Sequence, residues 1–335
     1  MPGDLAWLAQ VQEEVLDPER PICDPHHHLW DRPSHGERYL LDELLADFGG
    51  HRIVSTVFVE CAAFYRADGD AALRFVGETE FVQGVAAMSA SGDYGPVRAC
   101  AGIVSRADLT LTDVPSLLDA HVAASPNRFR GIRHASAYDP NPEIRRSHTA
   151  PPPGLLADAA FRRGFAELEK RGLSFDAWLY HHQIPELTAL ARAFPNVTIV
   201  FDHFGGPLGI GPYAGKRAEI FAQWRRDVDE LSRCENVVAK LGGLLMAINN
   251  WGFDQRAAPP GSAEIAEATL PWYLHAIERF DPRRCMFESN FPMDRVTCSY
   301  QVLWNSFKRI AAPFSESEKS ALFHDTAARV YRLEV

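Results

Sequence analysis

The sequence lacks the signals that mark membrane-spanning, secreted and nucleic-acid-binding proteins. Its 335 residues contain no apolar run of about 18, so we expect no segment that crosses a membrane. The amino-terminal segment has no basic stretch followed by an apolar one, so we expect no secretory signal and a cytoplasmic protein. The formal net charge of −10 provides no basic face, which argues against nucleic acid and anionic membranes as partners.

Several cysteine and catalytic signatures are also missing. The six cysteines form no C-x-x-C pair and most lie in apolar segments, which favours reduced, buried thiols over disulfides or a zinc knuckle. No G-x-S-x-G motif is present, so a serine hydrolase is not expected. The glycine-rich segment 205–212 has no lysine-serine pair and does not enter a helix, so we expect no phosphate cradle and no organic cofactor.

Short apolar runs that alternate with helical spacing are what the sequence does contain. Eight runs are rich in β-branched residues: Ile22–His26, Ile53–Glu60, Val97–Val104, Phe129–Arg133, Leu173–Leu179, Val197–Asp202, Val237–Leu241 and Cys285–Glu288. Between them lie segments with helical periodicity, among them Leu40–Phe48, Val114–Ala124, Phe161–Arg171, Ile184–Phe194, Ile220–Leu231 and Ile265–Phe280. This alternation predicts a parallel sheet covered by helices on both faces.

Eight strand–helix units favour an α/β protein with a closed (β/α)₈ TIM barrel, and a doubly wound open sheet is the alternative. A barrel absorbs all of residues 1–335 in a single catalytic domain. The longest irregular stretches, Ala135–Gly154, Phe204–Gly215 and Leu244–Gly261, each follow a predicted strand. In a barrel these three loops lie on the catalytic face, where substrate specificity is expected to reside.

Polar side chains end almost every predicted strand. In chain order they are His26 and His28, Glu60, Ser105 and Arg106, Arg133 and His134, His181 and His182, Asp202 and His203, Lys240, and Glu288 and Asn290. Because the carboxyl ends of barrel strands surround the active site, we expect these side chains to meet at one mouth.

The histidines of the first strand carry the strongest signal. His26 and His28 are two residues apart and project to the same face of a strand, whereas His27 points the other way into packing. Two imidazoles on one face suit a divalent metal or two oxygens of a bound anion. The histidines outside the strand ends are expected to be surface or packing residues: His35, His51, His121, His148, His275 and His324.

These motifs resemble an amidohydrolase-related family that includes the sugar-acid lactonases, the sulfomuconolactone hydrolase and the pyrone-dicarboxylate lactonase. The resemblance covers nearly the whole chain and is carried by DPHHHLW at 24–30, FRGIR at 129–133, FDAWLYH at 175–181, VFDHFGGP at 200–207, KLGG at 240–243 and RCMFESNFP at 284–292. It implies an amidohydrolase-type barrel. Some members of this family bind one zinc ion and others work without metal.

The resemblance also implies roles for individual residues. His26, His28 and His181 correspond to ligands of a metal, zinc for example, or of the substrate carbonyl, and His203 corresponds to the family's strand-six histidine. Arg133 is expected to hold a substrate carboxylate, for which a two-pronged guanidinium is suited.

One departure from the family pattern concerns the last strand, where Gly-Ser-Asp-Trp-Pro is replaced by Glu-Ser-Asn-Phe-Pro. The usual aspartate is a general base, and Asn290 cannot accept a proton at neutral pH. We hypothesise that Glu60 or Glu288 supplies the missing carboxylate, with Glu60 favoured because it lies nearer the mouth. The alternative is that these glutamates form internal ion pairs with Lys240 or Arg133.

The expected function is therefore hydrolysis of a small, anionic, cyclic substrate: a carboxylate-bearing lactone or a related cyclic ester or amide. Arg133 or Lys240 would hold the anionic group, while Trp30 and Trp178 either line the pocket or pack in the core. A non-oxidative decarboxylase on the same barrel and a non-catalytic ligand-binding barrel are the alternatives. Which substrate is bound, whether a metal is needed and whether the chain forms a homo-oligomer do not follow from the sequence.

Overall fold

The computed structural model describes residues 4–145 and 147–334. Its centre is an eight-stranded sheet in the order β1-β4-β5-β6-β7-β8-β9-β10, in which every neighbouring pair is parallel. The strands are β1 (Ile22–His27), β4 (Ile53–Val59), β5 (Arg98–Arg106), β6 (Phe129–Arg133), β7 (Ser174–Ala177), β8 (Ile199–Phe201), β9 (Val237–Leu241) and β10 (Cys285–Phe287). All eight predicted strands are confirmed.

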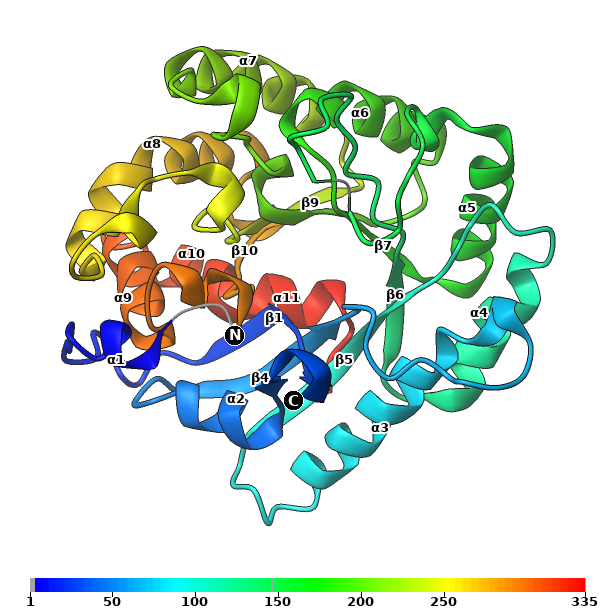
Figure 1. Cartoon of the computed structure of the whole chain (residues 1–335), viewed down its shortest axis with the longest axis horizontal. Coiled ribbons are helices and arrows are strands. Elements are labelled where there is room, and N and C mark those ends of the chain that lie inside the picture. Colours follow the sequence, from blue (N-terminus) through cyan, green and yellow to red (C-terminus); the bar gives the residue numbers. More distant parts are fainter. Residues whose placement is uncertain (1–3, 146, 335) are drawn as a thin grey trace.

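The sheet closes on itself where the chain leaves β10. The N–H of Asn290 donates to the carbonyl of His26 at 2.9 Å, and the N–H of His28 donates to the carbonyl of Phe291 at 2.8 Å. A parallel bridge joins His27 to Phe291 between them. This seam makes the sheet a (β/α)₈ barrel rather than a doubly wound open sheet (Figure 1).

Helices surround the barrel and alternate with its strands (Figure 1). The long ones are α2 (Leu41–Asp47), α3 (Val76–Ala90), α4 (Val114–Ala124), α5 (Ala159–Arg171), α6 (Ile184–Ala193), α7 (Arg217–Leu231), α8 (Ser262–Phe280) and α9 (Tyr300–Ile310). The six predicted helices are confirmed, with ends displaced by at most three residues. Within the described residues, no helix combines the length and apolar character that a membrane span needs. All six cysteines are unpaired, as expected.

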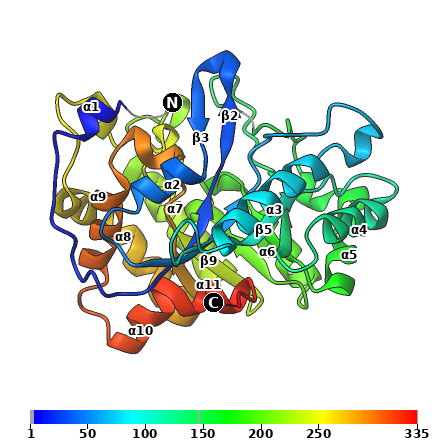
Figure 2. The ribbon, with the colours of Figure 1, turned by 90° about the horizontal axis from the view of Figure 1, so that it is seen from below.

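The two ends of the barrel differ in character. Short helices α10 (Glu316–Ser320) and α11 (Thr326–Val330) close one end, and the hairpin of β2 (Trp30–Arg32) and β3 (Glu37–Tyr39) projects from the other (Figure 2). At the closed end an apolar layer inside the barrel packs against the α11 segment; its members are Cys23, Val57, Val59, Val104, Val200, Val238, Met286, Ala327, Val330 and Tyr331. The hairpin follows the carboxyl end of β1, so the open end is the one at which strand-end side chains gather.

Candidate active site

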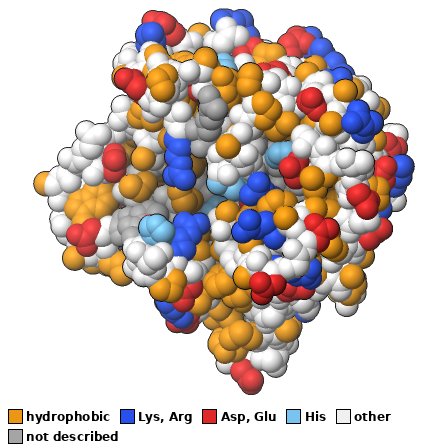
Figure 3. Space-filling view, turned by 45° about the vertical axis from the view of Figure 1, so that its right-hand side comes forward, with side chains coloured by type: hydrophobic (Ala, Val, Ile, Leu, Met, Phe, Trp, Pro, Cys, Tyr) orange, Lys and Arg blue, Asp and Glu red, His pale blue; other side chains and the backbone are white. Residues whose placement is uncertain are grey.

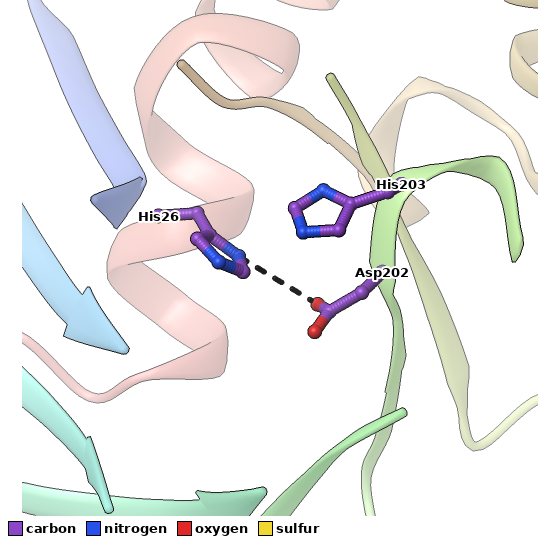
Figure 4. A group of neighbouring side chains, drawn as sticks. All are labelled: His26, Asp202 and His203. Carbon is purple, nitrogen blue, oxygen red and sulfur yellow. Dashed lines mark ion pairs between the residues drawn. The ribbon is translucent and has the colours of Figure 1, made fainter. Parts of the chain in front are cut away.

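Three of the predicted histidines converge at the open end. The ring centroids of His26 and His28 lie 5.0 Å apart, and those of His26 and His203 lie 4.4 Å apart. His27, between the first two, points outward and its Nε2 lies 2.7 Å from Thr56 Oγ1 on β4. The two-residue repeat of β1 therefore places His26 and His28 on the inner face, as predicted. Figure 4 shows His203 and Asp202 reaching toward His26 from the segment that follows β8.

A left-handed turn after β8 sets the direction of the His203 ring. His203 and Phe204 have φ values of 53° and 55°, and Gly205 and Gly206 continue the turn with positive φ. Gly243, just after β9, leaves room for the ring, because a Cβ at that position would lie 2.3 Å from His203 Nδ1. The glycine pairs that the sequence shows after β8 and β9 thus serve to bring an imidazole to the barrel axis.

Glu288 lies between His26 and His203. Its Oε1 is 2.6 Å from His203 Nδ1 and its Oε2 is 2.9 Å from His26 Nδ1. Burial raises the pKa of Glu288 to about 8, partly offset by Lys240, and burial lowers the pKa of His203 to about 3. Near neutral pH Glu288 is therefore protonated, and His203 is a neutral imidazole. Gly242 permits this arrangement, since a Cβ there would lie 2.2 Å from the Glu288 carbonyl oxygen.

A buried lysine and two buried aspartates form the layer below the histidines. Lys240 Nζ lies 2.6 Å from Asp176 Oδ2, 3.4 Å from Asp202 Oδ1 and 3.2 Å from His26 Nδ1. Burial would lower the pKa of Lys240, but these carboxylates and Glu288 outweigh it and raise the pKa. The ammonium group is fully buried, so it neutralises the layer and does not reach the cavity described below.

Arg133 and Glu60 form a second buried pair at the ends of β6 and β4. Arg133 Nε donates to Glu60 Oε1 at 2.7 Å, and a second guanidinium nitrogen donates to the Glu60 backbone carbonyl. The other Glu60 oxygen lies 2.8 Å from Nε2 of His148. Burial would raise the pKa of Glu60, but His148 and Arg133 outweigh it and hold the pKa well below its ordinary value. Glu60 is therefore ionised. The internal ion pair with Arg133, which the sequence analysis gave as an alternative role for Glu60, is present.

The expectation that His148 is only a surface or packing residue is wrong. It lies in the long loop between β6 and α5, yet its ring turns back onto Glu60 and lines the cavity. No periodicity marks loop residues, and the contact joins positions 88 residues apart. Asp176 and Asp294 were not singled out from the sequence either, although Asp176 lies within the FDAWLYH motif and Asp294 accepts from Asn290 Nδ2 at 3.3 Å.

The remaining predicted residues fall into two groups. Trp30 and Trp178 line the cavity. The ring centroids of Trp30 and His28 lie 6.1 Å apart, and those of Trp178 and His203 lie 5.1 Å apart. His181 lies apart: its ring is 5.2 Å from Tyr213, and its Nδ1 accepts from Leu208 N at 3.3 Å. Among the described residues it belongs neither to the cavity lining nor to the cluster of candidate metal ligands. A role for His181 as a ligand stays a prediction.

A cavity of about 290 Å³ opens above these groups. Its described lining consists of His28, Trp30, Arg32, Cys61, Ala62, Arg133, Arg145, Ser147, His148, Trp178, Tyr180, His203, Met246, Ile248, Asn290 and Met293. Histidine and basic side chains gather around a hollow in the space-filling view (Figure 3). None of the described lining residues carries a carboxylate, although the whole chain has 44 acidic and 34 basic side chains.

Side chains suited to one divalent cation meet beneath the cavity. Ligand atoms of His26, Asp202 and His203 lie within 4.8 Å of one another. Neither carboxylate oxygen of Asp202 has a hydrogen-bond partner among the described residues, and burial raises its pKa to about 6, partly offset by Lys240. Besides the protonated Glu288, three buried carboxyl groups near His26 (Glu60, Asp176 and Asp202) face two buried cations (Lys240 and Arg133). A bound cation would offset the negative charge that remains.

The histidine hydrogen bonds fit the same cation. His28 Nδ1 lies 2.8 Å from the Val59 carbonyl, which can only accept, so Nδ1 carries the proton and Nε2 keeps a free lone pair. His203 Nδ1 lies 2.6 Å from Oε1 of Glu288, which orients this second ring. Metal-binding histidines usually donate their second ring nitrogen to a carbonyl or a carboxylate, which orients the ring. The donor set therefore fits a zinc-like ion held by imidazole nitrogens and Asp202.

Comparisons with known proteins identify one family. A family model described as Amidohydrolase matches residues 23–333. The chain is 35% identical to the uncharacterised y4mH protein of Sinorhizobium fredii, over 93% of this chain and 98% of that protein. It is 28% identical to an L-fucono-1,5-lactonase of Burkholderia multivorans, over 65% and 68% of the two chains. A crystal structure of a Burkholderia multivorans amidohydrolase with bound zinc superposes with a TM-score of 0.71 at 25% identity, covering 93% of this chain and 99% of that one.

Proposed function

The chain belongs to the amidohydrolase family, and we propose that it opens the ring ester of a lactone by attack of water. Two features at one small cavity carry the proposal. His26, Asp202 and His203 offer ligand atoms for a divalent cation, and His148 in the cavity wall contacts the ionised carboxylate of Glu60. The similarity to an L-fucono-1,5-lactonase supports a cyclic ester as the substrate.

His148 and Glu60 would act as the general base. Glu60 is ionised and only accepts, so His148 Nε2 donates to it, and in the neutral ring Nδ1 has the lone pair that a proton from water requires. This dyad replaces the carboxylate that Asn290 lacks, by means of Glu60 acting through His148 and not by direct contact. The His203–Glu288 pair is less suited to the task, because burial lowers the pKa of His203 to about 3.

The proposed reaction balances in two steps. In the first, the water oxygen bonds to the ester carbonyl carbon while His148 Nδ1 takes a proton from the water. In the second, the bond between that carbon and the ring oxygen breaks, and the proton passes from His148 to the departing oxygen. The product is an open-chain hydroxy acid, and the dyad returns to its starting state.

The residues that would hold a divalent metal are His26, His28, His203 and Asp202. When bound, such an ion supplies Lewis-acid stabilisation for the negative charge that develops on the carbonyl oxygen. Lys240 and Asp176 would hold the surrounding charge in balance, and Glu288 would orient the His203 ring. Trp30 and Trp178 would provide apolar walls against the faces of a ring-shaped substrate.

The test is turnover of a panel of 1,4- and 1,5-lactones followed by titration of released acid, with metal content measured on the same protein. We expect acid release without CO₂, loss of activity on chelation and recovery with zinc. Release of CO₂ from an aromatic acid would favour the decarboxylase alternative. Ligand binding without any turnover would favour a binding protein.

A further inference from the structure

The two basic residues expected to hold the substrate's anionic group are already neutralised inside the protein. Arg133 is bound to the side chain and backbone of Glu60, and Lys240 is buried against Asp176 and Asp202. A guanidinium or ammonium that has a carboxylate partner contributes little further attraction to a second anion. If the substrate carries a negative charge, another residue must recognise it.

Arg145 is the basic residue of the cavity wall that has no such partner. Its side chain is exposed and lines the cavity, and among residues 4–145 and 147–334 no hydrogen bond or ion pair involves its guanidinium. Arg32, the third arginine of the wall, stacks over Trp30 at 4.8 Å, donates to the Cys61 carbonyl at 3.0 Å and pairs with the Glu37 carboxylate at 3.4 Å. Arg32 is therefore fixed in place, whereas the donors of Arg145 are free.

The loop that carries Arg145 is anchored at the backbone of Arg145 and again two residues later, at Ser147. The hydroxyl of Tyr180 donates to the Arg145 carbonyl, and the N–H of Ser147 donates to the carbonyl of Ala137 at 3.2 Å. Next along the loop, His148 contacts Glu60. One loop thus presents an unpaired guanidinium and the proposed base to the same cavity.

The charge of the wall agrees with an anionic ligand. Three arginines and three histidines line the cavity, and no carboxylate is found among the described lining residues. An acid-free wall in a chain of net charge −10 is a local arrangement that concentrates positive potential where a small anion would enter.

We propose that Arg145 determines substrate specificity by binding a carboxylate on the lactone, so that the enzyme prefers acid lactones to uncharged lactones of the same ring. This inference rests on the proposed function and extends it by naming the substrate class. A planar guanidinium can bind both carboxylate oxygens at once, which lysine cannot do.

The experiment compares an aldarolactone with the aldonolactone of the same ring, which carries a hydroxymethyl group where the first has a carboxylate. We expect the wild-type kcat/KM to favour the aldarolactone by about tenfold to a hundredfold, as for a charged hydrogen-bonded pair. Arg145→Gln should abolish that preference, chiefly through KM, and Arg145→Lys should restore part of it. Arg128→Gln, at the opposite end of β6, is the matched control and should leave the preference unchanged.

Failure of this inference is distinguishable from failure of the proposed function. Equal loss of both substrates in Arg145→Gln, or an unchanged preference, would overturn the specificity role while lactone hydrolysis still stands. If no lactone is turned over, the hydrolase proposal fails. The role of Arg145 in anion binding is then tested by calorimetry, which measures the affinity of wild type and variant for the open-chain aldarate and aldonate. Selective loss of aldarate binding in Arg145→Gln supports the inference, and equal binding by wild type and variant refutes it.

Discussion

Nε2 of His148 lies 2.8 Å from Oε2 of Glu60, and this contact ties the loop after β6 to the end of β4. Glu60 is fully buried and held ionised by Arg133, whereas His148 lies at the cavity surface. The carboxylate is thus shielded from water, and of the two side chains only the imidazole ring lines the cavity.

His148→Gln should lower kcat by about 10²–10⁴, because general-base catalysis contributes an acceleration of that size. The acidic limb of the pH–rate profile, which reports protonation of the base, should disappear with it. Titration of the acid released from the best lactone, at a series of pH values, measures both kcat and the pH–rate profile. His324→Gln, at a half-buried histidine beside Asp325, is the control and should behave as wild type. Full activity in His148→Gln would exclude the dyad.

Glu60→Gln should reduce both activity and stability. It removes the group that orients His148, and it takes from the buried Arg133 guanidinium its nearest counter-charge, since Asp202 lies farther away at 3.8 Å. Breaking a buried ion pair in this way costs about 3–5 kcal/mol in the free energy of unfolding. Urea unfolding and kcat measure the two effects. The double variant Glu60→Gln/Arg133→Met should recover much of the stability and none of the activity. Recovery of activity as well would show that Glu60 serves only as the partner of Arg133.

Asp202→Asn should lower affinity for zinc by about tenfold or more, since the amide keeps the shape and loses the charge. Metal content after dialysis and the zinc-induced rise in Tm both report this without any assay of activity. Asp229→Asn, on the helical surface beside Arg279, provides the control. An equal Tm response in wild type and Asp202→Asn would remove Asp202 from the ligand set.

Gly243→Ala should displace the His203 ring, because the added Cβ would lie 2.3 Å from Nδ1. Zinc affinity and kcat are both expected to fall while the fold is retained. Gly36→Ala is a close control: both glycines have a φ of 64°, but no atom lies within 4 Å of a Cβ at Gly36. Equal behaviour of the two variants would mean that backbone strain alone accounts for any loss.

Glu78→Gln should make the protein more stable in alkaline solution. Burial, followed by repulsion from Glu60, raises the pKa of Glu78 from 4.5 to about 8. The folded state therefore binds a proton that the unfolded state has released, and stability falls as pH rises from about 4.5 through about 8. The amide keeps the acceptor for the N–H groups of Cys61 and Ala63. Tm measured from pH 5 to pH 9 should decline less in Glu78→Gln than in wild type, and parallel curves would contradict this.

Much of the barrel was predictable because its signals are local. Alternating apolar runs and helical segments follow the periodicity of each element, and the two-residue spacing in β1 was enough to separate His26 and His28 from His27. The convergence of His203 with them followed from the rule that strand ends meet at one mouth. The sequence left open whether Trp178 lines the pocket or packs in the core, and in the structure it lines the cavity.

The rest of the site depends on contacts between distant segments. His148 and Arg145 lie in a loop whose path is set by Tyr180 and Glu60, and nothing in the spacing of the sequence shows that path. The neutralisation of Lys240 depends likewise on Asp176, which is 64 residues away and looks like part of a buried strand. Counting charges at strand ends identifies the participants but not their pairing.

The seam that closes the barrel is made by the residues of the site. The carbonyl of His26 and the amide of His28 supply its bonds on one side, and Asn290 and Phe291 supply them on the other. Any transient parting of the first and last strands would thus pull the imidazoles of β1 away from Glu288 in the same motion. Opening of the barrel at this seam and loss of the site geometry are therefore one event. Slow exchange of the His28 and Asn290 amide hydrogens for deuterium would show that this opening is rare.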